Sequence, residues 1–310
     1  MLIIYSQMSI QNSNAFKNKY NSNNNLVINI NEISSTINYL SRSVRNSQSK
    51  GNLNAANFIK DKLDDYGYEV DIEKFNIYKR KGIDDEVNRE NFFNLNADNL
   101  SPIGNSFNII AKNRFFDVNK KIIYVTAHFD TTSDTTGIID NATGVAVVLE
   151  LARTLQNNNG EINIMPIFFG AEELGLIGSR NFTLQLSDDE KEKILGCINF
   201  DMLGDINGEI SMHIHSKEGS KILDPPYIYN NENDNELSVM LNEELNIKKS
   251  IGYLTDDLPL HYIGIPTITI MDEHPNHEID YIDVDKGLSL LDLNRITAIT
   301  DKIRTFLINY

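Results

Sequence analysis

The sequence has almost no cysteine, with a single residue, Cys197, among 310. One thiol excludes an internal disulfide and any zinc site built from cysteines. A metal bound by this chain would therefore use histidine, aspartate and glutamate side chains. Cys197 itself lies in an apolar run, so we expect a small buried side chain there.

Positive charge is also scarce. The 28 lysines and arginines are outnumbered by 44 aspartates and glutamates, which gives a formal net charge of −16. This charge argues against nucleic acid or an anionic membrane surface as a partner. Some of the acidity could belong to metal ligands rather than to the surface.

The sequence contains no apolar run of membrane-spanning length. Its first residues, "MLIIYSQMSIQNSNAF", carry a short apolar patch without a basic start, so they make a poor signal peptide. On the sequence as given we expect a cytoplasmic protein, or a secreted one if a leader has been truncated.

Residues 1–30 are rich in asparagine and poor in core-forming side chains, which predicts a flexible leader. Residues 31–310 contain neither an internal repeat nor a Pro/Gly-rich linker, so we predict one domain. Near its start, a helical pattern that includes Leu53 stops at Gly67. A strand with Ile72 facing inward is predicted next.

The rest of the chain alternates β-prone apolar runs with helical patterns. This alternation is typical of a mostly parallel sheet covered by helices on both faces. We therefore predict an α/β protein, a three-layer α/β/α sandwich with a mixed, mostly parallel central sheet.

Four of the apolar runs end in histidine or acidic residues: "KIIYVTAHFD", "INIMPIFFGAEE", "ILGCINFDM" and "IPTITIMDEHPNH". Open α/β sheets bind ligands outside the carboxyl ends of their strands, where these endings would meet. The residues predicted to share one cleft are His128, Asp130, Glu172, Glu173, Asp201 and His274 or His277.

Clustered carboxylates repel one another and raise each other's pKa unless cations neutralise them. No lysine or arginine lies within the four strand endings, so a divalent metal is the simpler source of positive charge. A mixed His/Asp/Glu set suits zinc, or less specifically manganese or cobalt. Asp140, just before an apolar helix, is either a further ligand or only a helix N-cap.

Four motifs carry a resemblance to a known family. They are "HFD" at 128–130, "DNATGVA" at 140–146, "FFGAEELGLIGS" at 168–179 and "NFDM" at 199–202. In this order and spacing they resemble the M28 family of zinc aminopeptidases, from about Arg42 to the end of the chain. The resemblance implies the fold of zinc-dependent exopeptidases and two zinc ions.

The resemblance also implies roles for individual residues. His128 and Asp201 would hold one zinc, Glu173 and a C-terminal histidine the other, and Asp140 would bridge the two. In the family the peptide bond after the bridging aspartate, here Asp140–Asn141, tends to be cis.

Two residues would act without binding metal. Asp130 would accept the remaining ring N–H of His128 and fix its tautomer. Glu172 would be the general base and acid, taking a proton from the metal-bound water and delivering it to the leaving amine.

The match is less regular near the C-terminus. The family usually has a histidine, three residues and an aspartate, but relative to Asp280 His277 lies one residue too close and His274 two too far. We favour His277, with His274 as the alternative ligand. Asn276 occupies a position where some members have an oxyanion-stabilising tyrosine, so that this aid is either missing here or left to Tyr281 or Tyr262.

Other polar residues receive structural interpretations. Asp257 stands where the family motif has a histidine, and we expect it to line the cleft. His213 and His215 could form a metal-binding pair, but a polar sheet face is the more common role of such a pair. His261 is predicted to pack on an amphipathic helix.

The predicted function is a zinc aminopeptidase that hydrolyses the N-terminal peptide bond of peptides, with an acidic rim holding the free α-amine. A related dizinc carboxypeptidase or amide deacylase is one alternative. A non-catalytic binding module on the same fold is another, and loss of ligand residues would mark it. The side-chain preference and the oligomeric state are not predicted.

Overall fold

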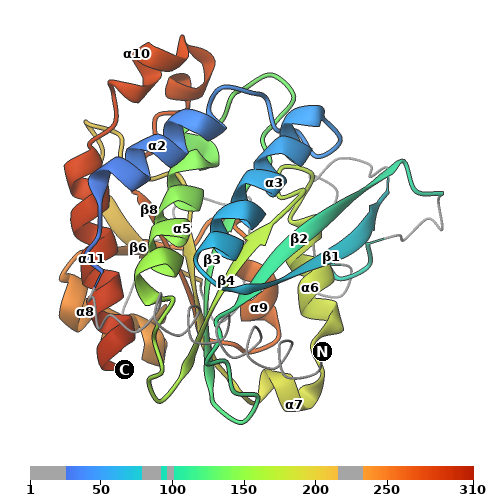
Figure 1. The fold of residues 1–310 in the computed structure, drawn as a ribbon, viewed down its shortest axis with the longest axis vertical. Helices are drawn as coiled ribbons and strands as arrows, with labels where there is room; N and C mark the ends of the chain where they lie inside the picture. Colours follow the sequence, from blue (N-terminus) through green and yellow to red (C-terminus); the bar gives the residue numbers. More distant parts are fainter. Residues whose placement is uncertain (1–25, 79–91, 96–100, 216–232) are drawn as a thin grey trace, which may run out of the picture.

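The computed structural model describes residues 26–78, 92–95, 101–215 and 233–310 (Figure 1). The predicted flexible leader, residues 1–30, therefore lies outside the described residues except for its last five positions. The helix α2 already begins at Ile30. No helix within the described residues is long and apolar enough to cross a membrane.

Within the described residues, the strands form one eight-stranded sheet in the order β1-β2-β4-β3-β5-β8-β6-β7. The central neighbours β4, β3, β5 and β8 are all parallel, whereas β2 and β6 pair antiparallel with β4 and β8. The predicted mixed, mostly parallel sheet is thus confirmed. The strands are β1 Glu69–Ile77, β2 Gly104–Lys112, β3 Ile122–His128, β4 Asn163–Phe169, β5 Ile194–Phe200, β6 Ile210–Ile214, β7 Lys248–Ile251 and β8 Thr267–Asp272.

Helices cover both faces of the sheet, as predicted (Figure 1). On one face the larger core is shared by α2 (Ile30–Leu40), α3 (Lys50–Asp65), α5 (Thr143–Leu155), α8 (Glu236–Leu245) and α11 (Leu293–Asn309). The other face packs against α6 (Ile177–Gln185) and α9 (Leu258–Tyr262). The short helix α7 (Asp188–Lys191) has no buried residue, and α10 (Val284–Leu288) contacts the larger core through Leu288.

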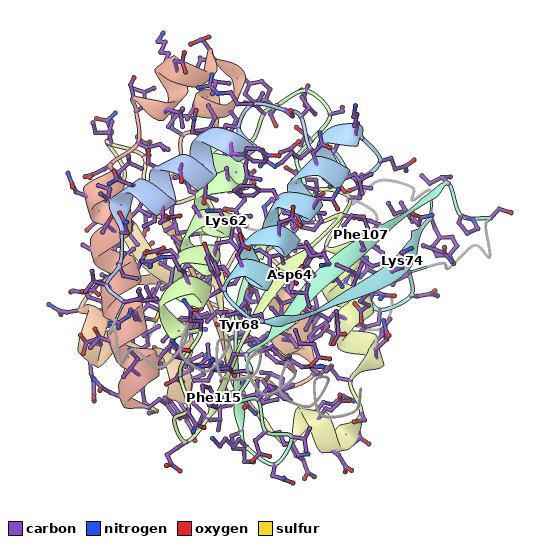
Figure 2. The ribbon with its side chains drawn as sticks, viewed as in Figure 1. Lys62, Asp64, Tyr68, Lys74, Phe107 and Phe115 are labelled. Atoms are coloured by element: carbon purple, nitrogen blue, oxygen red, sulfur yellow. The ribbon has the colours of Figure 1, made fainter. Side chains whose placement is uncertain are left out.

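The helix α5 is buried on almost every side, since Arg153 is its only residue that is not buried. A helix that is apolar all round belongs in the interior, and here α2, α3 and α11 cover its outer side. Its one buried carboxylate, Glu150, is paired with Arg153 at 2.7 Å. The Tyr68 hydroxyl, between α3 and β1, donates to the Ala152 carbonyl at 2.9 Å and ties this layer together (Figure 2).

Two expected inward-facing side chains point outward. Leu53 on α3 is 53% exposed, because Asn52, Ala55 and Ala56 form the buried face of that helix instead. Ile72 is 39% exposed, because β1 is the edge strand and the helices cover it incompletely. The alternation of apolar residues predicted the strand and, at Val70, the face that packs against the larger core, but not the exposure of Ile72.

Candidate metal centre and active site

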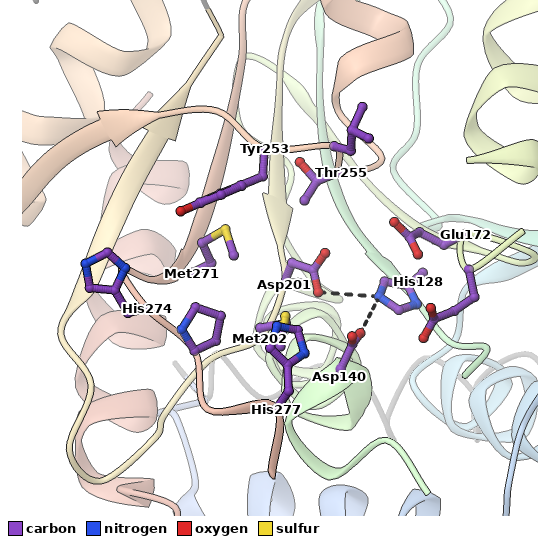
Figure 3. Close-up of a pocket in the computed structure, with 13 residues that line it drawn as sticks. His128, Asp140, Glu172, Asp201, Met202, Tyr253, Thr255, Met271, His274 and His277 are labelled. Carbon is purple, nitrogen blue, oxygen red and sulfur yellow. Dashed lines mark ion pairs between the residues drawn. The ribbon is translucent and has the colours of Figure 1, made fainter. Parts of the chain in front are cut away.

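The carboxyl ends of β3, β4, β5 and β8 meet at one edge of the sheet and open into a pocket of about 530 Å³ (Figure 3). The residues predicted from the four strand endings surround it, with the exception of Asp130. The lining consists of His128, Asp140, Glu172, Glu173, Asp201, Met202, Tyr253, Leu254, Thr255, Met271, His274, Pro275 and His277.

A first group of potential metal ligands is formed by His128, Asp140 and Asp201, whose ligand atoms lie within 4.8 Å of one another. His128 Nε2 is 3.0 Å from Asp140 Oδ1 and 3.4 Å from Asp201 Oδ1 (Figure 3). Burial alone would lower the pKa of His128, but Asp201 and Glu172 raise it well above the usual range. A histidine nitrogen facing two carboxylates is the arrangement that a bound cation needs.

A second group contains Asp140, His277 and Asp280, also within 4.8 Å. His277 begins the short 3₁₀ helix η3 (His277–Tyr281), whereas His274 lies on the pocket wall and belongs to neither group. The geometry therefore favours His277 over His274. Asp280 also accepts the Ile139 N–H at 2.8 Å, so it anchors the backbone just before Asp140.

Asp140 lies at a kink in the short segment η1 (Ile138–Ala142), where its backbone is not helical, and it does not cap α5, whose N-cap position is Ala142 without a side-chain hydrogen bond. The N-cap interpretation of Asp140 is therefore wrong. The Asp140–Asn141 peptide bond is cis, as the family resemblance implied. Asn141 fixes this segment by donating to Phe200 O at 2.8 Å and accepting from Gly144 N at 2.9 Å.

Asp130 lies just below the pocket and is fully buried. Its Oδ1 is 3.7 Å from His128 Nδ1, which is too long for the predicted hydrogen bond. The carboxylate instead accepts the Glu172 N–H at 3.0 Å and the Ser47 hydroxyl at 3.2 Å. Asp130 therefore joins the end of β3 to the turn that carries the paired glutamates.

Glu172 and Glu173 follow β4 and are held by the segment that follows β3. Glu173 Oε1 accepts the Thr132 N–H at 3.1 Å, and this carboxylate belongs to neither ligand group. Burial, followed by Asp140, raises the pKa of Glu173 to about 8. Burial also raises the pKa of Glu172 well above its usual range, with Asp256, Asp201 and Glu173 adding to the effect. These carboxylates thus need a cation to stay ionised together.

Asp256 is an acidic residue of this cluster that the sequence analysis missed. It is buried, and neither carboxylate oxygen has a hydrogen-bond partner within the described residues. Burial raises its pKa to about 7, although the charge of His128 works in the opposite direction. Asp256 is the first aspartate of "TDD" at 255–257, directly before Asp257, and this position was the signal that could have pointed to it.

Asp257 does not line the cleft, contrary to expectation. It is buried beneath the cleft, where its Oδ1 lies 3.1 Å from His215 Nε2 and accepts the hydroxyls of Thr255 and Thr269 at 2.7 and 2.9 Å. His215 is consequently a buried partner of Asp257 rather than part of a polar sheet face. Because His215 directly follows β6 and Asp257 occupies the N-cap position of α9, this pair joins the end of the strand to the start of the helix.

Neither of the tyrosines considered for stabilising the oxyanion, Tyr262 and Tyr281, lines the pocket. Tyr262 packs in a small apolar cluster with Phe92 and Leu258, and Tyr281 is 62% exposed and outside the pocket lining. The tyrosine that lines the pocket is Tyr253, whose ring lies 5.3 Å from that of His213. His213 is also buried, which lowers its pKa to about 4.

One cation does lie close to the acidic cluster. Arg45, from the segment between α2 and α3, is buried and is attracted electrostatically by Asp130, Asp280, Asp140 and Glu173. The absence of basic residues in the strand endings had suggested metal as the simpler source of positive charge. This arginine is 83 or more positions away in the sequence from the strand endings, so no local pattern linked it to the site.

The buried pair of His215 and Asp257 gives a stability prediction. Their contacts hold the pKa of Asp257 below its usual range despite burial, so the carboxylate stabilises the fold above the pKa of an unfolded aspartate. Asp257→Asn is expected to lower the unfolding free energy by about 3–5 kcal/mol at pH 7. The difference from the parent should shrink below about pH 4, as the parent carboxylate takes up its proton.

Urea unfolding of both proteins across this pH range measures the effect. The surface variant Asp285→Asn, whose partner Arg42 is itself half-exposed, is the control and should change stability little. A pH-independent difference for Asp257→Asn would contradict the assignment.

Curated relatives match part of this chain. The chain is 43% identical over 83 residues to the aminopeptidase YwaD of Bacillus subtilis, a match that covers 27% of this chain and 18% of the relative. It thus spans about a fifth of the length of such curated relatives.

Solved structures match over nearly the whole chain. BSAP, a zinc aminopeptidase from Bacillus subtilis, is 18% identical with a TM-score of 0.72, covering 92% of this chain and 95% of that one. A glutaminyl cyclase from Bacteroides thetaiotaomicron is 17% identical with a TM-score of 0.68, covering 92% and 99%. The model of peptidase family M28 matches residues 108–298. Because this match spans more than half of the chain and includes all four motifs, the protein belongs to peptidase family M28.

Proposed function

We propose that this protein is a zinc aminopeptidase that hydrolyses the N-terminal peptide bond of peptides. One observation carries the proposal. Two groups of potential metal ligands meet at this pocket and have Asp140 in common, and Glu172 lines the same pocket. The names of related proteins, which include several aminopeptidases, support the same reaction.

The chain's own donor atoms fit zinc. They are imidazole nitrogens and carboxylate oxygens, and Asp201 Oδ1 is buried without a hydrogen-bond partner in the described part of the chain. We assign His128 and Asp201 to one zinc ion and His277 and Glu173 to a second. Asp140 is the bridging ligand, because it is the residue common to both groups. The same donors would accept manganese or cobalt.

When bound, the metal pair would lower the pKa of a water molecule and polarise the scissile carbonyl. Glu172 is the general base that takes the proton from that water and later donates it to the leaving amine. Asp130 positions Glu172 by accepting its backbone N–H.

The pocket lining also includes apolar side chains. Met202, Leu254 and Met271 would accommodate the first side chain of the substrate. The carboxylates would attract a free α-amine, which supports an aminopeptidase over a carboxypeptidase or deacylase. Every ligand position is filled and Glu172 is present, which argues against a binding module without activity.

Hydrolysis of an amino-acid amide tests the proposed reaction. Turnover is expected to stop with a chelator and to return when zinc is added. Acetylation of the substrate amine should abolish turnover, because the carboxylates would lose the charged group they hold. Cleavage of the acetylated substrate at an equal rate would support the deacylase instead, and no turnover with zinc bound would support the binding module.

The adjacent glutamates form a matched pair for mutagenesis. Glu172→Gln should lower kcat about 10²- to 10⁴-fold with unchanged zinc content, since it removes the proton acceptor only. Glu173→Gln should weaken zinc binding, since it removes a ligand. Activity assays combined with metal analysis distinguish the two roles, and loss of zinc from Glu172→Gln would refute its assignment.

The two C-terminal histidines can be separated in the same way. His277→Ala should leave the purified chain with one zinc ion instead of two, because His277 groups with Asp140. His274→Ala should retain both, because His274 lies only on the pocket wall. The opposite pattern in metal analysis would make His274 the ligand.

A further inference from the structure

Arg45 is one of the largest fully buried side chains in the described structure, and its guanidinium is bonded to backbone alone. Nε donates to Phe129 O at 2.9 Å, Nη1 to Leu40 O at 2.7 Å and Thr136 O at 2.5 Å, and Nη2 to Gly137 O at 3.0 Å. Four carbonyls thus converge on one planar group, which only an arginine has enough donors to satisfy.

The positions of these carbonyls in the chain connect Arg45 with the metal site. Phe129 directly follows His128, while Thr136 and Gly137 precede Asp140 by four and three positions. The guanidinium therefore joins both ends of the loop between two metal-ligand positions. Leu40, the last residue of α2, provides the fixed point outside the loop.

The surroundings hold the arginine itself in place. Its backbone N–H donates to Thr131 Oγ1 at 2.9 Å, and its carbonyl accepts from Asn52 Nδ2 at 2.8 Å. Gly137 has a φ of 59°, and a Cβ added there would lie 2.7 Å from Arg45 Nη2. A residue other than glycine would thus displace either the guanidinium or the loop.

The charge of Arg45 is directed at the site without forming an ion pair. In the described residues no carboxylate lies within ion-pair distance of it, although Asp130, Asp280, Asp140 and Glu173 all attract it. Burial lowers its pKa to about 10, so the group remains charged at neutral pH. Hydrogen bonds hold the loop, and the long-range charge offsets part of the repulsion among the carboxylates.

We propose that Arg45 is a positioning residue that holds His128 and Asp140 at the spacing required for zinc, through the bonds of its guanidinium to the intervening loop. The proposal rests on the proposed zinc site. It predicts that the planar group, and not the positive charge alone, sets the metal affinity. A merely structural arginine would affect the stability of the fold and leave the affinity of folded protein for zinc unchanged.

Zinc affinity of the full chain, measured by competition with a chromophoric chelator, tests the proposal. Arg45→Lys keeps the charge without the planar group, and Arg45→Met removes both. Each is expected to weaken zinc binding about 10- to 100-fold, the usual cost of losing a residue that orients metal ligands. Arg295→Lys is the matched control, because Arg295 also donates to backbone carbonyls, those of Gly208 and Asp205, away from the pocket.

Rescue by free guanidinium gives a readout that a stability defect would not produce. A second pocket, of about 260 Å³ between α2 and α3, is lined in part by Arg45, Gly51 and Ala55. Arg45→Ala would extend this pocket to the four carbonyls, so guanidinium at non-denaturing concentration should restore zinc affinity. Arg45→Met fills the same space and should not respond.

The outcomes separate the two proposals. If the parent chain binds no zinc, the proposed function fails. If the parent binds zinc and Arg45→Lys binds it equally well, the positioning role is overturned, whatever the result for Arg45→Met. If Arg45→Met does not fold, the zinc affinity of Arg45→Lys and the response of Arg45→Ala to guanidinium test the proposal. If Arg45→Ala binds zinc more weakly and guanidinium does not restore its affinity, the proposal is also overturned.

Discussion

Repulsion among carboxylates that share one buried edge of a sheet is the constraint on which this structure depends. Burial and mutual repulsion raise the pKa of Glu172, Glu173 and Asp201, and only cations can keep such groups ionised together. Asp140 differs, because its hydrogen bond and charge interaction with His128 lower its pKa in spite of burial. The site therefore needs positive charge at its centre to keep these carboxylates ionised.

The sheet and the segments that follow its strands hold His128 and the two glutamates close together. His128 is paired with Phe169 across the parallel strands β3 and β4, so the segments that follow the two strands leave the sheet side by side. Asp130 then accepts the backbone N–H of Glu172, and the backbone N–H of Thr132 donates to the Glu173 carboxylate. Adjacent glutamates can take different roles because different backbone and side-chain partners hold each of them.

Much of the fold and most of the site could be predicted from local sequence. The strand endings follow apolar runs, so the edge at which His128, Glu172 and Asp201 meet follows from parallel pairing alone. The prediction failed where the burial of a residue depends on which elements pack over it. Leu53 and Ile72 have the right periodicity, but the packing of neighbouring elements leaves them exposed.

The sequence by itself determined which residues gather at the pocket, because most of them stand within a few residues of a strand that ends there; Asp140, in the segment between β3 and α5, is the exception. Only the tertiary structure distinguished His277 from His274, since a short helical turn brings the His277 ring, and not that of His274, into a group with Asp140 among the described residues. It also paired Asp257 with His215 and placed Arg45 behind the metal-ligand loop. Those contacts join segments far apart in the chain, and their distances depend on how the whole core packs.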